Sequence, residues 1–101
     1  MVYGIVTDVA APAEVYDALH ARVTSSGGEA VGLLVHIGRA TAGGFQVIEV
    51  WESKDLCDRY NAELVNPAIA ELSGGQPPPM DPAIEEFEPR GLVVPAAHVF
   101  V

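Results

Sequence analysis

The chain has 101 residues, half of them hydrophobic, and carries a formal net charge of −9 from 14 acidic and 5 basic residues. A surface this acidic repels phosphate backbones and anionic lipid, and no apolar run approaches the ~20 residues of a membrane span, so we expect neither nucleic acid nor a membrane as a partner. The length is that of one domain, residues 1–101. The lone Cys57 and the lack of a recognisable signal peptide predict a cytoplasmic protein.

The first half of the chain predicts a strand, a helix and a β-hairpin. Residues 2–9, "VYGIVTDV", are rich in β-branched residues, which favour a strand. The stretch "APAEVYDALHARV" follows, with apolar residues at helical spacing after Pro12, which suits a first helical position. The runs "VGLLVHIGRA" and "GFQVIEVW" flank the glycine-bearing "TAGG", an arrangement typical of two strands joined by a turn.

The second half predicts another helix and a fourth strand. Ser53 is a good helix cap, and a stripe of apolar residues predicts a helix over about 54–72. Pro67 interrupts that helix and removes one backbone donor, so we expect a kink just before it. The stretch "SGGQPPPMDP" has the composition of a loop. A fourth strand is expected within about 84–94, interrupted near Pro89.

Strand, helix, strand, strand, helix, strand is the order of the ferredoxin-like βαββαβ fold, an α+β architecture in which two helices cover one face of an antiparallel sheet. The other face of such a sheet normally meets water and is polar. Here the hairpin carries apolar residues on both faces: Val35 and Ile37 are expected on one, and Leu34 lies with His36 on the other. We therefore expect a second copy of the chain to cover the open face, which gives a homodimer.

The stretch "EVWESKDLCDRYN", residues 49–61, combines a strand that ends in a tryptophan with a helix that carries an aromatic residue about two turns later. This pattern resembles the antibiotic biosynthesis monooxygenase-like (ABM) family of dimeric α/β barrels. The resemblance extends over about residues 1–72 and is strongest over 45–61. It implies a pocket between the sheet and the two helices of each subunit, where Trp51 matches the strand-ending tryptophan and Tyr60 the helix aromatic.

The same family includes cofactor-free quinone-forming monooxygenases, haem-degrading enzymes, polyketide cyclases and small proteins of no established activity. Its haem-degrading members use a histidine on the second helix and an asparagine on the first strand, and this chain has neither residue at those places. The sequence also lacks the ligand spacings of zinc and calcium sites and any phosphate-binding glycine loop. We therefore expect no cofactor and no metal.

Three residues are candidates for moving a proton. His36 lies mid-strand and, if the hairpin is symmetric about "TAGG", near Ile48 on the same face. It could be a general base, or a partly buried histidine with a structural hydrogen bond. Tyr16 and His20 are four residues apart on the first helix and therefore lie side by side. They could form a proton-moving pair in a pocket, or the half-solvated edge of a helix face.

Other candidates would contact a ligand. Trp51 and Tyr60 could stack on a planar substrate, or could simply pack strand against helix. Asn61, beside the inner stripe of the second helix, could hold a carbonyl oxygen, or could be a polar residue at the helix boundary. Arg90 could bind a carboxylate or a phenolate. Cys57 lies in the first turns of a helix, where the dipole lowers a thiol pKa, but a buried, inert thiol is the preferred interpretation.

The residues and the resemblance predict a small-molecule-binding protein, and the resemblance implies a cofactor-independent monooxygenase acting on a planar phenolic or polyketide-like substrate. In that interpretation the catalytic residues are Tyr60, His36 and Asn61, and the substrate-binding residues are Trp51, Tyr16, His20 and Arg90. Two alternatives stay open: a non-catalytic dimeric binding or accessory protein, and a polyketide-cyclase-like enzyme. An open, partly polar cavity between the second helix and the sheet favours an enzyme, and a packed interior favours the accessory protein.

Overall fold

The computed structural model describes residues 2–75 and 82–100, so most of the predicted loop after the second helix lies outside the described residues. The elements are, in chain order, β1 (Tyr3–Val9), α1 (Ala13–Thr24), β2 (Leu33–Thr41), β3 (Gly44–Trp51), α2 (Lys54–Tyr60), the π-helical turn η1 (Asn61–Val65), α3 (Asn66–Leu72), β4 (Ala83–Phe87), β5 (Val93–Val94), the 3-10 turn η2 (Pro95–Ala97) and β6 (Val99–Phe100). Among the described residues, no helix is long and apolar enough to cross a bilayer.

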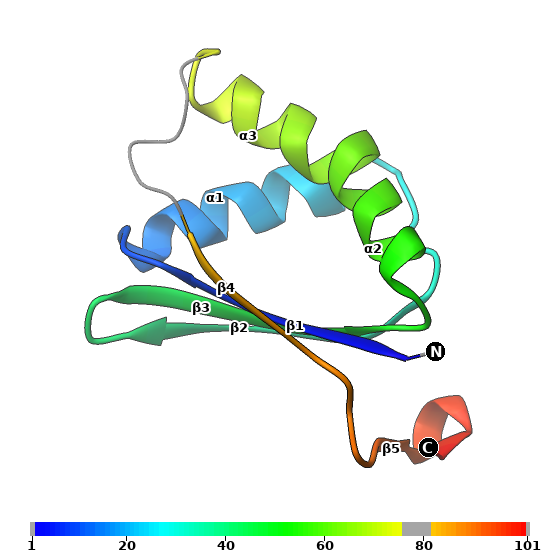
Figure 1. Ribbon diagram of the computed structural model, residues 1–101. Coiled ribbons are helices and arrows are strands. Elements are labelled where there is room, and N and C mark those ends of the chain that lie inside the picture. The colour runs from blue at the N-terminus through cyan, green and yellow to red at the C-terminus, as the bar shows by residue number, and fades with distance from the viewer. Residues whose placement is uncertain (1, 76–81, 101) are drawn as a thin grey trace.

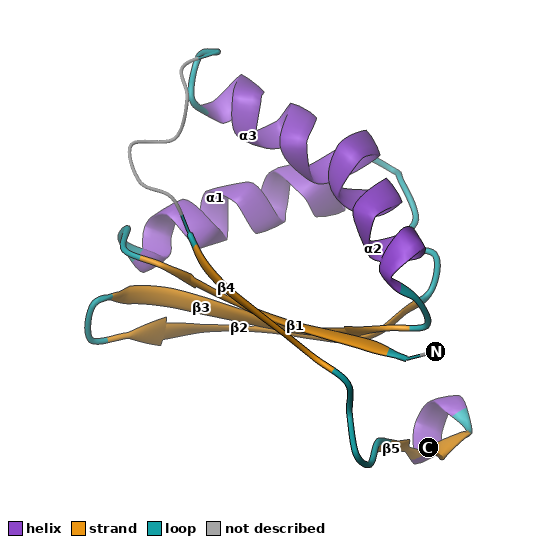
Figure 2. Ribbon diagram, in the orientation of Figure 1, coloured by secondary structure: helices purple, strands orange, loops and turns teal. Residues whose placement is uncertain are grey.

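The sheet and the helices form two layers. Strands β2, β3, β1 and β4 lie in that order, and each neighbouring pair is antiparallel. Helix α1 and the continuous α2–η1–α3 helix cover one face of this sheet (Figure 1, Figure 2). The prediction of a ferredoxin-like α+β fold is confirmed, and so is the interruption of the last strand near Pro89: β5 pairs with β6 in a separate two-stranded sheet, which lies on the side away from the helices.

The hairpin turn sets which residues of β2 and β3 face each other. Thr41 pairs with Gly44, so the turn itself has two residues, and the same register pairs His36 with Glu49 and Ile37 with Ile48. The expectation that His36 lies beside Ile48 on one face is therefore wrong. Since side chains alternate between faces, a shift of one position puts a different residue beside the histidine. A register shift between Leu33 and Val35 also breaks strict alternation at the far end of β2.

The second helix begins and continues as its sequence dictates. The Ser53 hydroxyl accepts a hydrogen bond from the Leu56 N–H at 3.3 Å, which caps the first turn. The expected irregularity before Pro67 takes the form of the π-helical turn η1, in which the Asn66 N–H donates to the Asn61 carbonyl five residues earlier. Proline offers no N–H and its ring crowds the carbonyl four residues before it, so a wider turn at this point relieves both problems.

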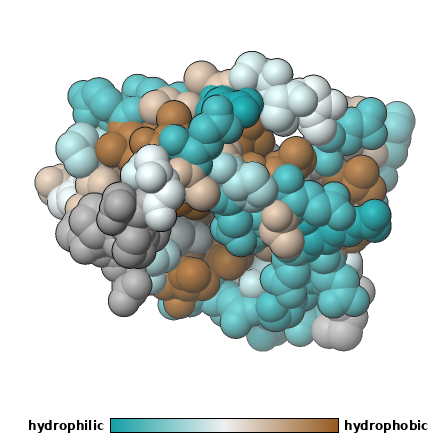
Figure 3. All heavy atoms as spheres, turned by 90° about the horizontal axis from the view of Figure 1, so that it is seen from above, coloured by the Kyte–Doolittle hydropathy of each residue, from teal (hydrophilic) through white to brown (hydrophobic). Residues whose placement is uncertain are grey.

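The core is small for a chain of this size. The buried apolar residues are Val23, Phe45, Val50, Trp51, Cys57 and Ala68. The accessible surface is 6545 Å², against roughly 5,500 Å² expected for a compact monomer of this mass. Large side chains such as Ile37 and Phe87 remain exposed on the face of the sheet away from the helices. Apolar atoms also show among polar ones on the helical side (Figure 3). The homodimer stays a prediction, and this surface is what motivates it.

Candidate functional site

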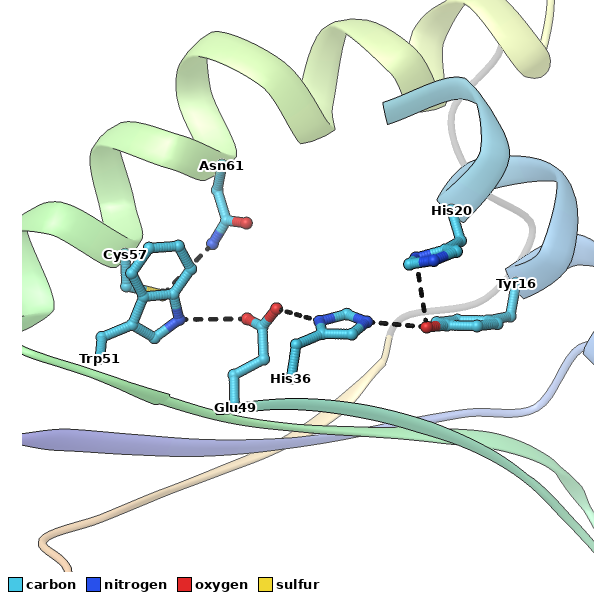
Figure 4. Close-up of polar contacts among 7 residues, drawn as sticks. All are labelled: Tyr16, His20, His36, Glu49, Trp51, Cys57 and Asn61. Atoms are coloured by element: carbon cyan, nitrogen blue, oxygen red, sulfur yellow. Dashed lines mark hydrogen bonds and ion pairs between the residues drawn. The ribbon is translucent and has the colours of Figure 1, made fainter. Parts of the chain in front are cut away.

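A chain of hydrogen bonds runs across the helix-facing side of the sheet (Figure 4). It starts at Trp51, whose Nε1–H donates to Glu49 Oε1 at 3.2 Å. The second carboxylate oxygen of Glu49 lies 2.7 Å from His36 Nδ1, and His36 Nε2 lies 2.7 Å from the hydroxyl of Tyr16. The chain ends at His20, whose Nδ1 is 3.4 Å from that hydroxyl, a long and weak contact.

Each member of this network is placed by the fold. The β2–β3 register sets His36 opposite Glu49. Trp51 follows Glu49 by two positions on β3, so both side chains point to the same face. Tyr16 reaches the network from α1 because Gly38 lies beneath its ring: a Cβ at Gly38 would collide with the Tyr16 ring and hydroxyl.

The rings of this cluster lie nearly parallel. The Tyr16 ring stacks on those of His20 and His36, with centroids 5.4 and 6.0 Å apart and interplanar angles of 15° and 20°. The two imidazoles are themselves stacked at 5.5 Å. Phe45 closes the cluster from β3, with its ring 5.7 Å from that of Tyr16. Three nearly parallel rings and the Phe45 ring, tilted by 55° to that of Tyr16, thus lie beside the polar atoms.

Water reaches one part of the network and not the other. The side chains of His36 and Glu49 are 26% and 13% exposed, Tyr16 is half-buried and His20 is exposed. Trp51, at the opposite end, is fully buried. The imidazole is therefore partly open to solvent, while the carboxylate that orients it is more shielded.

Trp51 and Tyr60 are in contact with each other. The Trp51 and Tyr60 rings lie 5.1 Å apart and are tilted by 49°. Burial raises the pKa of Tyr60, and the negative charge of Glu49 adds to that shift. The pKa of Tyr16 is raised by the same two causes in the same order. Both phenols therefore stay protonated at neutral pH.

Cys57 and Asn61 form a small group beside Trp51. The Asn61 amide Nδ2 donates to Cys57 Sγ at 3.7 Å, and its Oδ1 is directed away from the sulfur (Figure 4). Burial, assisted by the charge of Glu49, raises the pKa of the Cys57 thiol to about 11. This outweighs any lowering by the helix dipole and agrees with the preferred interpretation of an inert thiol.

The candidate residues therefore fall into two groups and one outlier. His36, Tyr16 and His20 come together near α1, while Trp51, Tyr60 and Asn61 lie near α2. Arg90 joins neither group, since it is exposed in the segment after β4, which leaves the sheet on the side away from the helices.

Sequence reasoning missed Glu49, the residue that links the two groups. The available signal was one acidic residue in the middle of the apolar strand "FQVIEVW". A carboxylate at such a position needs partners because its desolvation is costly.

Two hollows lie close to the second helix. A smaller, partly open one of about 150 Å³ has Tyr60 in its wall, together with Glu29, Val31, Leu56, Arg59, Glu63 and Leu64. A wide, open one of about 460 Å³ lies at the edge formed by Tyr3, Lys54 and Phe87. Over residues 2–75 and 82–100, no group of three or more His, Cys, Asp or Glu side chains is arranged to hold a metal ion.

Comparison with known proteins identifies the fold. No protein-family model and no curated protein matches the sequence. Among solved structures, a candidate antibiotic biosynthesis monooxygenase from Chloroflexus aurantiacus is 22% identical over 93% of this chain and 98% of its own, with a TM-score of 0.65. The match to SnoaB, a cofactor-independent oxygenase from Streptomyces nogalater solved as a mutant, has 16% identity, 88% and 91% coverage, and a TM-score of 0.57.

A third similar structure is the heme-degrader MhuD from Mycobacterium tuberculosis, solved with two hemes bound in its active site. It is 25% identical over 93% of this chain and 99% of its own, with a TM-score of 0.53. The resemblance to the ABM-like superfamily is thus confirmed as a likeness of fold. Because the identities are low and the neighbours differ in activity, fold alone does not select the chemistry.

Proposed function

We propose that this chain is a small-molecule-binding protein that activates a planar phenolic or polyketide-like substrate with its own side chains, as a cofactor-independent monooxygenase. One observation carries the proposal: a carboxylate and an imidazole on the sheet are hydrogen-bonded in a chain with a phenol from α1, beside the aromatic rings of Trp51 and Tyr60. Such a substrate requires a general base to take its proton and aromatic side chains to contact its ring.

Packing alone is a poor explanation for this arrangement. Placing a carboxylate and an imidazole on the inner face of a sheet costs desolvation free energy, and apolar residues of similar size would avoid that cost. Clusters of interacting titratable groups with raised pKa values, such as those of Tyr16 and Tyr60, concentrate at functional sites. The partial exposure of His36 supports the same interpretation, because a base must reach its ligand.

The proposed reaction balances without a cofactor. A hydroxyarene with a hydrogen on the para carbon loses its hydroxyl proton, with His36 as the final base, and the resulting anion reacts at that carbon with O₂. The sum is hydroxyarene plus O₂ to quinone plus water, in which O₂ oxidises the ring. The half-buried Tyr60, packed against the fully buried Trp51, contacts the ring, and the free Oδ1 side of Asn61 orients the substrate. Arg90 is not included, because its position after β4 separates it from these groups.

The neighbours support oxygen chemistry, and the residues here favour the cofactor-free kind. SnoaB is described as a cofactor-independent oxygenase and MhuD as a heme-degrader. A haem iron needs an axial ligand, and the α2–η1–α3 helix carries no histidine. Both ring nitrogens of His36 already have partners, Glu49 and Tyr16, so this histidine does not fit the part of an axial ligand.

Binding and turnover test the proposal together. Metal-free protein is screened for thermal stabilisation by hydroxynaphthalenes and hydroxyanthracenes, and the stabilising compounds are followed with an oxygen electrode and by quinone absorbance. We expect oxygen uptake equal to quinone formed, lost in His36→Asn and retained in the matched control His98→Asn on the exposed tail. Binding without oxygen uptake would indicate the accessory protein, and a cyclised product the cyclase. No stabilisation by any compound contradicts both enzymes and is the result expected of an accessory protein with a packed interior.

Homodimerisation is part of the same proposal, because the sheet face away from the helices carries exposed apolar side chains. Light scattering at micromolar concentration is expected to give twice the 10.6 kDa mass of one chain. Ile37→Lys, on that face, should give a monomer. Val15→Lys on α1 is the matched control, since Val15 and Ile37 are 48% and 49% exposed. A parent that is monomeric contradicts this part of the proposal.

A further inference from the structure

We propose that Tyr16 is a catalytic proton carrier of this site: its phenol takes the proton of a substrate hydroxyl while passing its own proton to His36, whose orientation Glu49 fixes. The inference rests on the proposed function only in that the ligand has an ionisable hydroxyl. The proposed function names His36 as the base but does not say by which route the proton reaches it. This inference gives that route and assigns Glu49 the role of orienting His36.

The direction follows from what each atom can donate. The Glu49 carboxylate is an acceptor only, so the hydrogen of the 2.7 Å contact must lie on His36 Nδ1. Neutral His36 then has a bare Nε2, which can only accept. The hydrogen of the second 2.7 Å contact must therefore come from the Tyr16 hydroxyl. Tyr16 thus donates to His36, and His36 donates to Glu49.

Glu49 is held so that this direction cannot easily reverse. One of its oxygens accepts from Trp51 Nε1–H and the other from His36 Nδ1–H, so both ends of the carboxylate are fixed. Trp51 is fully buried, which anchors the donor. Glu49 and Trp51 are positioning residues in this scheme, because they act through His36 rather than on the ligand.

Tyr16 is placed to meet a ligand. Its ring lies against Gly38 and stacks on two imidazoles, which fixes the hydroxyl, and the residue is only half-buried. When the Tyr16 O–H bond breaks toward His36 Nε2, the tyrosine oxygen forms a new O–H bond with the proton of the substrate hydroxyl. The products are a substrate anion, a neutral Tyr16 that now donates to that anion, and an imidazolium paired with Glu49. No electrons are transferred, and no bond to oxygen gas is needed at this step.

Electrostatics agree with this exchange. The titratable groups that face His36 are Glu49 from β3 and Tyr16 and His20 from α1, and the charge of Glu49 also reaches Tyr60 and Cys57 on α2. Burial and the charge of Glu49 raise the pKa of Tyr16, which keeps it a neutral phenol that relays a proton instead of losing one. The imidazolium that the exchange produces keeps its hydrogen bond to the Glu49 carboxylate.

The tautomer of His36 is tested first, without any ligand. Nitrogen-15 NMR of histidine side chains distinguishes a protonated Nδ1 from a protonated Nε2. We expect neutral His36 to carry its hydrogen on Nδ1 in the parent and in Glu52→Gln, an exposed glutamate control. Glu49→Gln can offer an N–H to Nδ1 and should move the hydrogen to Nε2. A parent with the hydrogen on Nε2 overturns the proposal.

Transfer itself is tested with 4-nitrophenol, whose anion is coloured and whose ionisation needs no oxygen. The parent and Tyr3→Phe, a control hydroxyl bonded to Glu86 outside the site, should bind it and ionise it alike. Tyr16→Phe should bind it with an ionisation constant about tenfold smaller, a shift of one pKa unit. Equal ionisation in Tyr16→Phe, or a parent that does not bind the phenol, overturns the inference. Ionisation without quinone formation from the larger hydroxyarenes supports the inference and contradicts only the monooxygenase.

Discussion

The two ends of the layer between the helices and the sheet are built differently, although one glutamate joins them. Near α2, Trp51 and Cys57 are 0% and 1% exposed. Near α1, by contrast, the His36 side chain is 26% exposed and His20 is open to solvent. Glu49 gives one oxygen to each end. The closed end contributes to the core, and the open end keeps polar atoms accessible to solvent. Under the proposed function, stability and chemistry are therefore separated along a single strand pair.

The largest effect is expected at the closed end. Trp51→Ala removes the largest fully buried side chain and the donor to Glu49, and we expect a loss of ~3–5 kcal/mol in the free energy of unfolding. Denaturant midpoints measure this loss. Trp51→Phe keeps most of the volume and should lose clearly less. A small loss for Trp51→Ala would mean that a cavity already exists beside the ring, and the contrast between the two ends would disappear.

At the open end, the contact between α1 and β2 is tested by adding a methyl group. Gly38→Ala places a methyl group where the Tyr16 ring lies, so Tyr16 must move from its contact with His36. Overpacking of this kind costs ~1–3 kcal/mol. Gly43→Ala in the same hairpin, where nothing lies within 4 Å, is the control and should stay close to the parent. A Gly38→Ala protein as stable as the parent, with unchanged phenol ionisation, would show that Tyr16 does not depend on this contact.

The buried thiol of Cys57 makes stability depend on pH in the alkaline range, because its pKa is raised from 9.0 to about 11. Between these values the unfolded chain loses the thiol proton and the folded chain keeps it, so stability falls as pH rises, by up to about 1.4 kcal/mol per pH unit. Urea midpoints from pH 8 to pH 11 should show this fall, and Cys57→Ala should reduce it. The buried tyrosines contribute a fall that remains in the variant. Equal slopes in both proteins would contradict a shielded thiol.

The smallest change in stability is expected at Tyr60, in the group near α2. Among the described residues, the Tyr60 hydroxyl makes no hydrogen bond, so Tyr60→Phe should leave the denaturant midpoint within about 0.5 kcal/mol of the parent. Its effect belongs to binding: a planar phenol should stabilise the variant less than the parent in a thermal-shift assay. A loss of about 1 kcal/mol with unchanged phenol binding would assign Tyr60 to packing.

The fold could be predicted because its signals are local. Runs of β-branched residues, the glycine turn and the Ser53 cap each determine an element with a few neighbouring residues, and the order of elements then leaves one common architecture. Pro67 predicted an irregularity at the right place. Its form, a π-helical turn, could not be predicted, because a proline is accommodated equally well by a bend.

The site was predicted only in part because it depends on register. Tyr16 and His20 are neighbours on one helix, and this follows directly from helical spacing. The partner of His36 depends on the two-residue turn, and a slip of one position replaces Glu49 with Ile48. The approach of Tyr16 to His36 depends on how α1 lies over Gly38, a tertiary contact that no local pattern encodes.

The π-helical turn before Pro67 has a consequence for insertions and deletions. A π turn accommodates one residue more than the α-helical turn it replaces, so loss of one residue within 61–65 would restore the ordinary helical period. The proline would then stand where an α-helix requires an N–H and where its ring crowds the carbonyl four residues before it. The additional residue and the proline are therefore coupled. A shortened version of this helix should be stable only when the proline is replaced in the same step, and related chains should gain or lose the two features together.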